Sequence, residues 1–245
     1  MKKMRLDQLL VERAIYPTRE QAQRAVMAGE VKVGEQTAAK PSLLVEPDAP
    51  IATADLPRFV GRGGLKLEGA LDYFGIELCE LTVVDIGAST GGFTDCLLQR
   101  DAKKVYAIDV GHGQLAWKIR NDPRVIVLER TNARHLSPSI IDEPAELCVV
   151  DVSFISLTLI LPNAFELIVP NGIVLALIKP QFELERADVG RGGIVRDVAL
   201  HQKAQHKLAT FIERLGHTVI GITSSCITGA DGNQEFFICA RKQSE

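Results

Sequence analysis

Four charged residues that lie far apart in the sequence have side chains able to move a proton: Lys66, Asp151, Lys179 and Glu235. Two lysines and two carboxylates form a charge-balanced cluster, which a protein can keep partly buried. A desolvated lysine has its pKa lowered enough to act as a general base, which suits removal of a proton from a hydroxyl group. The alternative is that each side chain is a solvated charge at a strand end. That alternative is the stronger one for any single lysine, but for the four together we favour the cluster.

A glycine-containing loop indicates a second kind of chemistry, the binding of a nucleotide-like cofactor. A near-continuous apolar run leads from Leu81 to Asp85, as in strands buried on both faces. Gly87 and Gly91 let the backbone turn tightly and come close to a ligand. Asp109, twenty-two residues past Gly87, suits hydrogen bonds to ribose hydroxyls. The loop residues expected to bind the cofactor are Asp85 (through water or backbone donors), Gly87, Ala88, Ser89, Gly91, Gly92 and Phe93, and Asp151 is expected to bind it as well.

The charge of this loop separates two classes of cofactor. Its spacing is not the dinucleotide pattern Gly-x-Gly-x-x-Gly, because position 89 is Ser, and Asp85 would repel a pyrophosphate. S-adenosylmethionine (SAM) carries a sulfonium and an ammonium, which Asp85 would attract. We therefore predict a SAM site, with a glycine turn in a cofactor-free protein as the alternative. Asn132 either meets the adenine edge or only caps the following turn, and the sequence does not choose between these roles.

The chemistry of the methyl acceptor is indicated by the residues after the fourth expected strand. Methyltransferases that act on amino groups usually carry Asn/Asp-Pro-Pro-Tyr/Phe at this place, whereas this chain has Asp151-Val-Ser-Phe154. A hydroxyl acceptor, whose proton must leave as the methyl arrives, fits this chain and its lysines better.

The elements that would position these residues alternate between strand and helix from residue 63 onward. Such alternation predicts an α/β fold with a doubly wound, mostly parallel sheet. Asp151 and Lys179 would end the fourth and fifth strands, at the carboxyl edge where open α/β sheets bind ligands. The last two of seven strands read as an antiparallel pair. We expect helices at 65–74, 92–100, 113–120 and 197–215, and strands at 81–86, 104–109, 124–128, 146–151, 172–178, 218–225 and 235–241.

The first segment of the chain has a different pattern, of two short helices at 5–14 and 18–28 followed by short strands. Thr18 and Gln21 form a capping-box pattern at the start of the second helix. A stretch containing Pro47, Pro50 and Pro57 precedes the change of character. We therefore predict a domain at 1–57, a linker at 58–61 and a larger domain at 62–245.

Composition and charge limit the possible functions. The five cysteines form no Cys-x-x-Cys pair, which indicates a reducing compartment, hence the cytoplasm, and no metal site. The most apolar stretch is interrupted by prolines and polar residues, so we expect neither a membrane span nor a signal peptide. The net charge is −3, but residues 1–40 carry +3 and the remainder −6. Any electrostatic grip on RNA should therefore be centred on the first segment.

Several segments, spread over essentially the whole chain, resemble the TlyA family, which is often labelled hemolysin A. Three of them look like an S4 RNA-binding domain: Arg5-Leu-Asp-Gln-Leu-Leu, Thr18-Arg-Glu-Gln-Ala and Gly29-Glu-Val-Lys-Val-Gly34. Four others look like the methyltransferase segments of the family: Gly61-Arg-Gly-Gly-Leu-Lys-Leu67, Asp85 to Phe93, Asp151-Val-Ser-Phe-Ile-Ser156 and Lys179-Pro-Gln-Phe-Glu183. The chain departs from the family at one place, where Pro57-Arg-Phe-Val60 replaces an interdomain Arg-Ala-Trp-Val. That linker is thought to influence SAM binding in relatives.

The resemblance implies a class I SAM-dependent methyltransferase, with a small N-terminal α+β S4 domain, that methylates the ribose 2′-hydroxyl of cytidine in ribosomal RNA. Related FtsJ-type enzymes use a Lys-Asp-Lys-Glu tetrad, which maps onto Lys66, Asp151, Lys179 and Glu235. It implies that Lys179 is the base-like residue, that Asp151 and Glu235 set its pKa, and that Lys66 orients the sugar.

RNA contacts are expected from basic residues in two regions. In S4 folds the two short helices and the loop after them present basic groups to RNA phosphates. The residues that fit are Arg5, Arg19, Arg24 and Lys32 in the first segment, and Arg191 and Arg196 in a loop at 188–196. Ordinary solvated charges and a plain connector are the respective alternatives. Two other functions stay open, namely a membrane-active hemolysin and an RNA-binding module with a degenerate enzyme domain.

Overall fold

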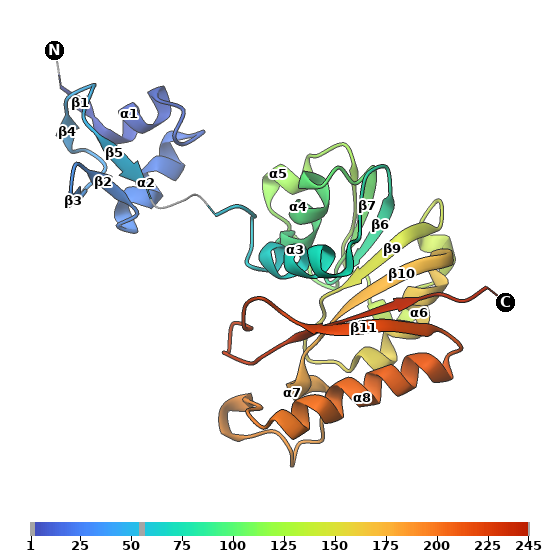
Figure 1. The fold of residues 1–245 in the computed structure, drawn as a ribbon. Helices are drawn as coiled ribbons and strands as arrows, with labels where there is room; N and C mark the ends of the chain where they lie inside the picture. The colour runs from blue at the N-terminus through green and yellow to red at the C-terminus, as the bar shows by residue number, and fades with distance from the viewer. Residues whose placement is uncertain (1–2, 54–56, 245) are drawn as a thin grey trace. The chain divides into compact units, whose positions relative to one another are not determined.

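The computed structural model describes residues 3–53 and 57–244, except for the side chain of Arg191. The chain divides into two compact units, Met1–Arg58 and Phe59–Glu245 (Figure 1). The domain boundaries given above, with a linker at 58–61, stay predictions.

The smaller unit packs two helices, α1 (Leu6–Glu12) and α2 (Arg19–Met27), onto short strands. Thr18 caps α2, since its hydroxyl oxygen accepts a hydrogen bond from the backbone N–H of Gln21 (3.3 Å). Apolar side chains of both helices and of β2 form a separate core, which includes Leu6, Leu10 and Val26. The strands are β1 (Met4–Arg5) paired with β4 (Leu44–Val45), and β3 (Gln36–Thr37), β2 (Val31–Val33) and β5 (Ile51–Thr53) in that order.

The larger unit is built on a seven-stranded sheet with the order β11-β12-β10-β9-β6-β7-β8. Its first five strands along the chain are parallel, whereas β12 runs antiparallel to both β10 and β11. The predicted fold class, a mostly parallel sheet with a closing antiparallel pair, is confirmed. The strands are β6 (Thr82–Ile86), β7 (Lys104–Ile108), β8 (Val125–Leu128), β9 (Ala145–Val150), β10 (Ile168–Ile178), β11 (Thr218–Ser224) and β12 (Phe236–Arg241).

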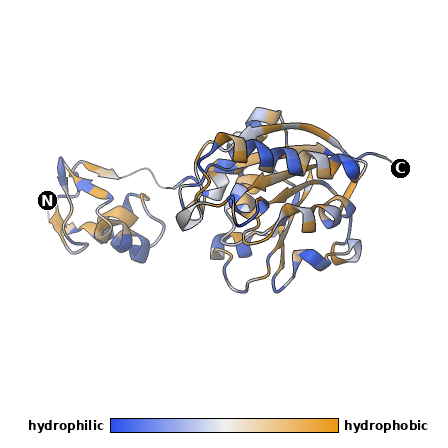
Figure 2. Ribbon diagram, turned by 90° about the horizontal axis from the view of Figure 1, so that it is seen from below, coloured by the Kyte–Doolittle hydropathy of each residue, from blue (hydrophilic) through white to orange (hydrophobic). Residues whose placement is uncertain are grey.

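Helices cover both faces of this sheet because the central strands are apolar on both sides. On one face, α3 (Gly63–Phe74), α4 (Gly92–Gln99) and α5 (Trp117–Arg120) contribute to one hydrophobic core. On the other, α6 (Leu161–Glu166) and α8 (Val198–Arg214) contribute to a second one. Figure 2 shows the orange strands between helices whose outer faces are blue. The remaining helical segments are α7 (Pro180–Glu183), η1 (Ala133–His135), η2 (Pro138–Ile140), η3 (Leu157–Leu159) and η4 (Arg191–Gly193).

One expected helix is much shorter than predicted. The helix at 113–120 forms only as the single turn α5, because the chain before it is held in a loop. There the N–H of Gly113, with a φ of 70°, donates to the carboxylate of Glu129 (2.8 Å). Glycine in this conformation cannot begin an α-helix, so the helix starts only at Trp117.

Candidate active site

The glycine loop lies at the carboxyl edge of the sheet, between β6 and α4, and is pressed against the end of β9. Gly87 has a φ of 90°, and a Cβ at this position would lie 2.2 Å from the backbone oxygen of Asp151. Gly91 has a φ of 94°, and its Cβ would lie 2.9 Å from a methyl carbon of Leu115. The loop therefore needs glycine both for its backbone conformation and for its close packing.

Asp109, directly after β7, holds the same loop through its carboxylate. One oxygen accepts a hydrogen bond from the N–H of Ser89 and the other from the N–H of Gly111, both at 2.7 Å. Ser89 has a φ of 49°, so this contact stabilises a backbone conformation that is uncommon for serine. Asp109 also lines a narrow recess, together with Ala88, Gln114, Leu115 and Glu129 among others.

Asp85 lies beneath the loop and not on its surface. Asp85 is 0% exposed. One of its carboxylate oxygens accepts a hydrogen bond from the Thr94 hydroxyl (2.6 Å), and the other has no hydrogen-bond partner among the described residues. Burial, followed by the nearby charges of Asp151 and Asp109, raises the pKa of Asp85 to about 7. Direct contact of Asp85 with a ligand would require a change in this packing, whereas the expected contact through water or backbone donors would not.

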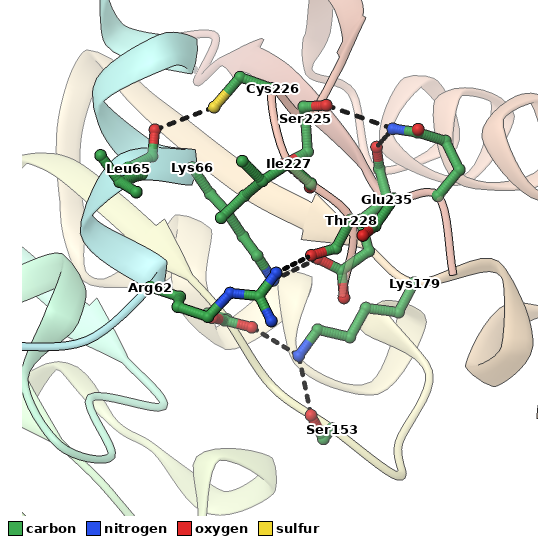
Figure 3. A network of polar contacts seen from close by, with 12 residues as sticks. Arg62, Leu65, Lys66, Ser153, Lys179, Ser225, Cys226, Ile227, Thr228 and Glu235 are labelled. Carbon is green, nitrogen blue, oxygen red and sulfur yellow. Dashed lines mark hydrogen bonds and ion pairs between the residues drawn. The ribbon is translucent and has the colours of Figure 1, made fainter. Parts of the chain in front are cut away.

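A cavity of about 130 Å³ opens beside the loop. Of the residues predicted to bind the cofactor, Gly87, Ala88, Ser89, Gly92, Phe93 and Asp151 line it, whereas Asp85, Gly91 and Asp109 do not. Gly61, Arg62, Gly63 and Thr90 also line it and were not predicted. Arg62 is exposed and donates to the backbone oxygen of Thr228 (3.0 Å), which links α3 to the loop before β12 (Figure 3). The signal that could have revealed these residues is the Gly61-Arg-Gly-Gly segment.

Lys66, three residues along α3 from the cavity-lining Gly63, forms a buried ion pair with Glu235. The Lys66 Nζ atom lies 2.5 Å from Glu235 Oε2, and the two residues are 8% and 3% exposed. Lys66 comes from α3 and Glu235 from the residue directly before β12, so the pair joins elements 169 residues apart (Figure 3). Glu235 was expected to begin the last strand, and it precedes that strand by one residue.

Lys179 and Asp151 form the second ion pair at the same edge. Lys179 follows β10, and its Nζ atom lies 2.6 Å from Asp151 Oδ1 and 2.8 Å from the hydroxyl oxygen of Ser153 (Figure 3). The tetrad is thus organised as two pairs. Glu235 forms its ion pair with Lys66, and Asp151 forms the one with Lys179. The expectation that Asp151 and Glu235 together set the pKa of Lys179 stays a prediction.

Phe154, beside these pairs, is unusually placed for an aromatic residue. Its φ is 63°, a conformation that bulky residues rarely adopt, and it is 89% exposed. Its ring lies 5.0 Å, centroid to centroid, from the ring of Phe182 on α7. The Asp151-Val-Ser-Phe154 segment therefore provides an acid, a hydroxyl and an exposed ring within four residues.

Asn132 takes the capping role that was the alternative to adenine contact. Its side-chain oxygen accepts a hydrogen bond from the N–H of Arg134 (3.0 Å) at the start of η1.

The loop at 188–196 is held by a residue that the sequence did not reveal. The buried amide of Asn233 accepts from the N–H of Val195 and donates to the oxygen of Gly193, both at 2.9 Å.

The predicted RNA-binding arginines and lysine of the smaller unit all reach the surface. Arg24 and Lys32 are exposed, while Arg5 and Arg19 both contact Asp7. In the larger unit Arg196 is exposed, and the side chain of Arg191 lies outside the described part of the structure.

Comparison with known proteins agrees with this architecture, which defines a class I methyltransferase with a small additional domain. The FtsJ-like methyltransferase model matches residues 59–242 and the S4 domain model matches residues 4–51. The 16S/23S rRNA (cytidine-2′-O)-methyltransferase TlyA of Mycobacterium tuberculosis is 42% identical over all of this chain and 92% of its own length. The chain belongs to the TlyA family of FtsJ-like methyltransferases with an S4 domain.

Two further relatives are similar over nearly the whole chain. A candidate rRNA methyltransferase, YqxC of Bacillus subtilis, is 49% identical over 97% of this chain and 85% of its own length. A solved structure of a candidate hemolysin from Streptococcus thermophilus is 42% identical, covers all of this chain and 90% of its own, and superposes with a TM-score of 0.76.

In residues 3–53 and 57–244 we find no helix both long and apolar enough to cross a membrane. Within those ranges no three His, Cys, Asp or Glu side chains gather as around a metal ion.

Proposed function

We propose that this protein transfers a methyl group from SAM to the 2′-hydroxyl of a ribose, that of a cytidine, in ribosomal RNA. The observation that carries the proposal is the pair of Lys–carboxylate contacts, Lys66 with Glu235 and Lys179 with Asp151, beside a glycine-lined cavity. The family to which the chain belongs implies the use of SAM as methyl donor. The named activity of the M. tuberculosis relative supports a ribosomal RNA cytidine as the methyl acceptor. Work on ribosomal RNA would place the enzyme in the cytoplasm.

The residues at the glycine loop fit SAM chemically. Asp151 lines the cavity, and the buried Asp85 has one carboxylate oxygen without a hydrogen-bond partner among the described residues, so two acids are available near a bound sulfonium and ammonium. The absence of a Cβ at Gly87 lets the end of β9 pack against the loop, which supports the position of Asp151 in the wall of the cavity. Asp109, already fixed by two backbone N–H groups, lines the recess that includes Ala88 and Ser89 and would accept a hydrogen bond from a ribose hydroxyl. When bound, SAM supplies an electrophilic methyl group.

The two ion pairs divide the remaining work between positioning and proton removal. Lys179, in its amine form, would accept the proton that leaves the 2′-hydroxyl, and Asp151 would stabilise the ammonium that results. Ser153 holds the same nitrogen from a second direction. Lys66, fixed by Glu235, would orient the sugar by hydrogen bonding. Because the reaction requires an in-line approach to the methyl carbon, orientation by these side chains should dominate the rate.

Phe154 supports an RNA substrate in particular. Proteins that read single-stranded RNA commonly stack unpaired bases on exposed aromatic rings. Phe154 is 89% exposed, follows Asp151 by three residues and packs its ring against Phe182, which follows Lys179 by three residues, so a base stacked on it would lie close to the tetrad. The S4 unit would then supply the phosphate contacts that hold the rest of the RNA or ribosomal subunit.

The test is transfer of a tritiated methyl group from SAM to purified ribosomal subunits, followed by mapping of the modified nucleotide. Lys179→Ala should abolish transfer while SAM affinity, measured by calorimetry, changes little. Lys103→Ala, which removes an exposed lysine of the same unit, is the control and should remain active. Full activity of Lys179→Ala would refute the assigned role. RNA binding without SAM binding would indicate a degenerate enzyme domain, and leakage of liposomes by the pure protein would indicate a hemolysin.

A further inference from the structure

Asp7, in the first turn of α1, is a fully buried acid in the smaller unit. The residue is 0% exposed, although acids at this position of a helix usually face solvent and interact with the helix dipole. Its carboxylate accepts four hydrogen bonds: from Arg5 Nε (3.0 Å) and a terminal Arg5 nitrogen (2.9 Å), from Arg19 Nε (2.9 Å), and from Gln23 Nε2 (2.7 Å). These donors keep the pKa of Asp7 well below its usual range, with the Arg5 hydrogen bonds as the largest cause.

The two arginines that contact Asp7 remain at the surface. Their side chains are 39% and 48% exposed, so each guanidinium has one side on the buried carboxylate and another toward solvent. Arg19 uses only Nε for Asp7, and within the described residues its two terminal nitrogens have no protein partner. Two guanidinium groups around one carboxylate leave a formal charge of +1, concentrated between β1 and the start of α2.

This arrangement matches what a phosphate group requires. Guanidinium groups bind phosphate through forked, charge-assisted hydrogen bonds, and an arginine whose orientation is already fixed loses less entropy on binding. Resting on the proposed function, in which the S4 unit holds RNA, we propose that Asp7 is the positioning residue of an RNA phosphate site formed by Arg5 and Arg19. Asp7 does not touch the phosphate; it holds both arginines so that their free N–H groups converge on it.

The effect of removing Asp7 on RNA affinity has opposite signs for a purely electrostatic role and for a positioning role. If Asp7 only neutralises nearby positive charge, its removal makes the surface more basic and RNA binding tighter. If Asp7 positions the arginines, its removal weakens RNA binding although the net charge becomes more positive. The sign of the change therefore separates the two roles.

The experiment measures binding of the full-length protein to a fluorescein-labelled RNA hairpin by fluorescence anisotropy, over a series of KCl concentrations. Asp7→Asn, which keeps the side-chain shape, should weaken binding by roughly tenfold, as expected for lost charge-assisted hydrogen bonds. It should also reduce the salt dependence by about one phosphate contact. Glu12→Gln is the matched control, because it removes one negative charge from an exposed position of the same helix and should leave affinity unchanged or slightly higher. Equal or tighter binding by Asp7→Asn would overturn the proposal.

Two further measurements exclude a general effect on folding. In a protein carrying Arg5→Ala and Arg19→Ala, Asp7→Asn should have no further effect on affinity, because Asp7 acts through these arginines. If Asp7→Asn does not fold, Arg19→Lys keeps the charge but not the fork, and it should bind the hairpin several times more weakly than Arg214→Lys, which changes an exposed arginine of α8. Equal binding by these two lysine variants would refute the phosphate site. If the wild-type protein methylates subunits and Asp7→Asn binds RNA as tightly as the wild type, the phosphate-site inference is rejected. The proposed function is then unaffected.

Discussion

Replacing either member of the Lys66–Glu235 pair should destabilise the larger unit, and replacing both should not. The two residues are 8% and 3% exposed and their charged atoms lie 2.5 Å apart, so each charge is stabilised mainly by the other. Lys66→Met or Glu235→Gln alone leaves one buried charge without its partner. In Lys66→Met/Glu235→Gln neither charge remains.

The size of the effect follows from this burial. Removing one partner of a buried ion pair costs about 3–5 kcal/mol, whereas replacing both is often close to neutral. The lower end applies here, because the Lys66 side chain retains 10% exposure at the edge of the sheet. For a domain of this size, about 3 kcal/mol corresponds to a melting temperature lower by roughly 6–12 °C. The double variant should melt within about 3 °C of the wild type.

Thermal unfolding followed by circular dichroism, with urea unfolding as a second measurement, tests these values. Lys203→Met is the control for an ion pair at the surface, since Lys203 and Asp188 are 58% and 27% exposed at 2.6 Å. That change should cost less than about 1 kcal/mol. The reasoning is refuted if the double variant loses as much stability as the two single variants together. Methyl transfer should be lost in all three site variants, which separates the catalytic role of the pair from its structural one.

Three further predictions concern the cofactor loop and the second ion pair. The pKa of Asp85 is raised to about 7, first by burial and then by neighbouring acids, and a cationic ligand favours its ionised form. SAM affinity measured by calorimetry should therefore rise about tenfold between pH 6 and pH 8, and Asp85→Asn should lose this dependence. Gly87→Ala places a methyl group 2.2 Å from the Asp151 backbone oxygen and should weaken SAM binding at least about tenfold in the same assay. Ser153→Ala should lower kcat more than it raises KM in the methyl-transfer assay, and Ser153→Thr should restore kcat, because the hydroxyl holds Lys179.

The fold could be predicted because its signals are local. The central strands are apolar on both faces, and each is followed by a polar residue at the sheet edge, as with Asp109, Asp151 and Lys179. The glycine loop could be recognised for the same reason, since its conformation requires glycine at positions 87 and 91.

The contacts within the site could not be predicted, because they depend on how distant elements meet. The sequence predicts that Lys66, Lys179, Asp151 and Glu235 gather at one edge of the sheet, but it does not say which lysine pairs with which acid. In the structure Glu235 pairs with Lys66 and Asp151 with Lys179. Asp7 is a similar case. In the sequence it is one acid in the first turn of a helix, and only the packing of α1 and α2 buries it between two arginines.

The antiparallel strand β12 explains how a fourth residue reaches the site. Parallel strands bring their last residues to the carboxyl edge, and β9 and β10 contribute Asp151 and Lys179 in this way. Because β12 runs opposite to β10, with Phe236 paired to Ile178, it brings its beginning to that edge. Glu235, the residue before Phe236, is therefore placed beside Lys179 and within reach of Lys66 on α3. A parallel strand in this position would have placed its far end, at Arg241, at the edge instead. A reversed last strand thus lets the sheet provide an acid for Lys66 on α3 as well as one for Lys179 at its own edge.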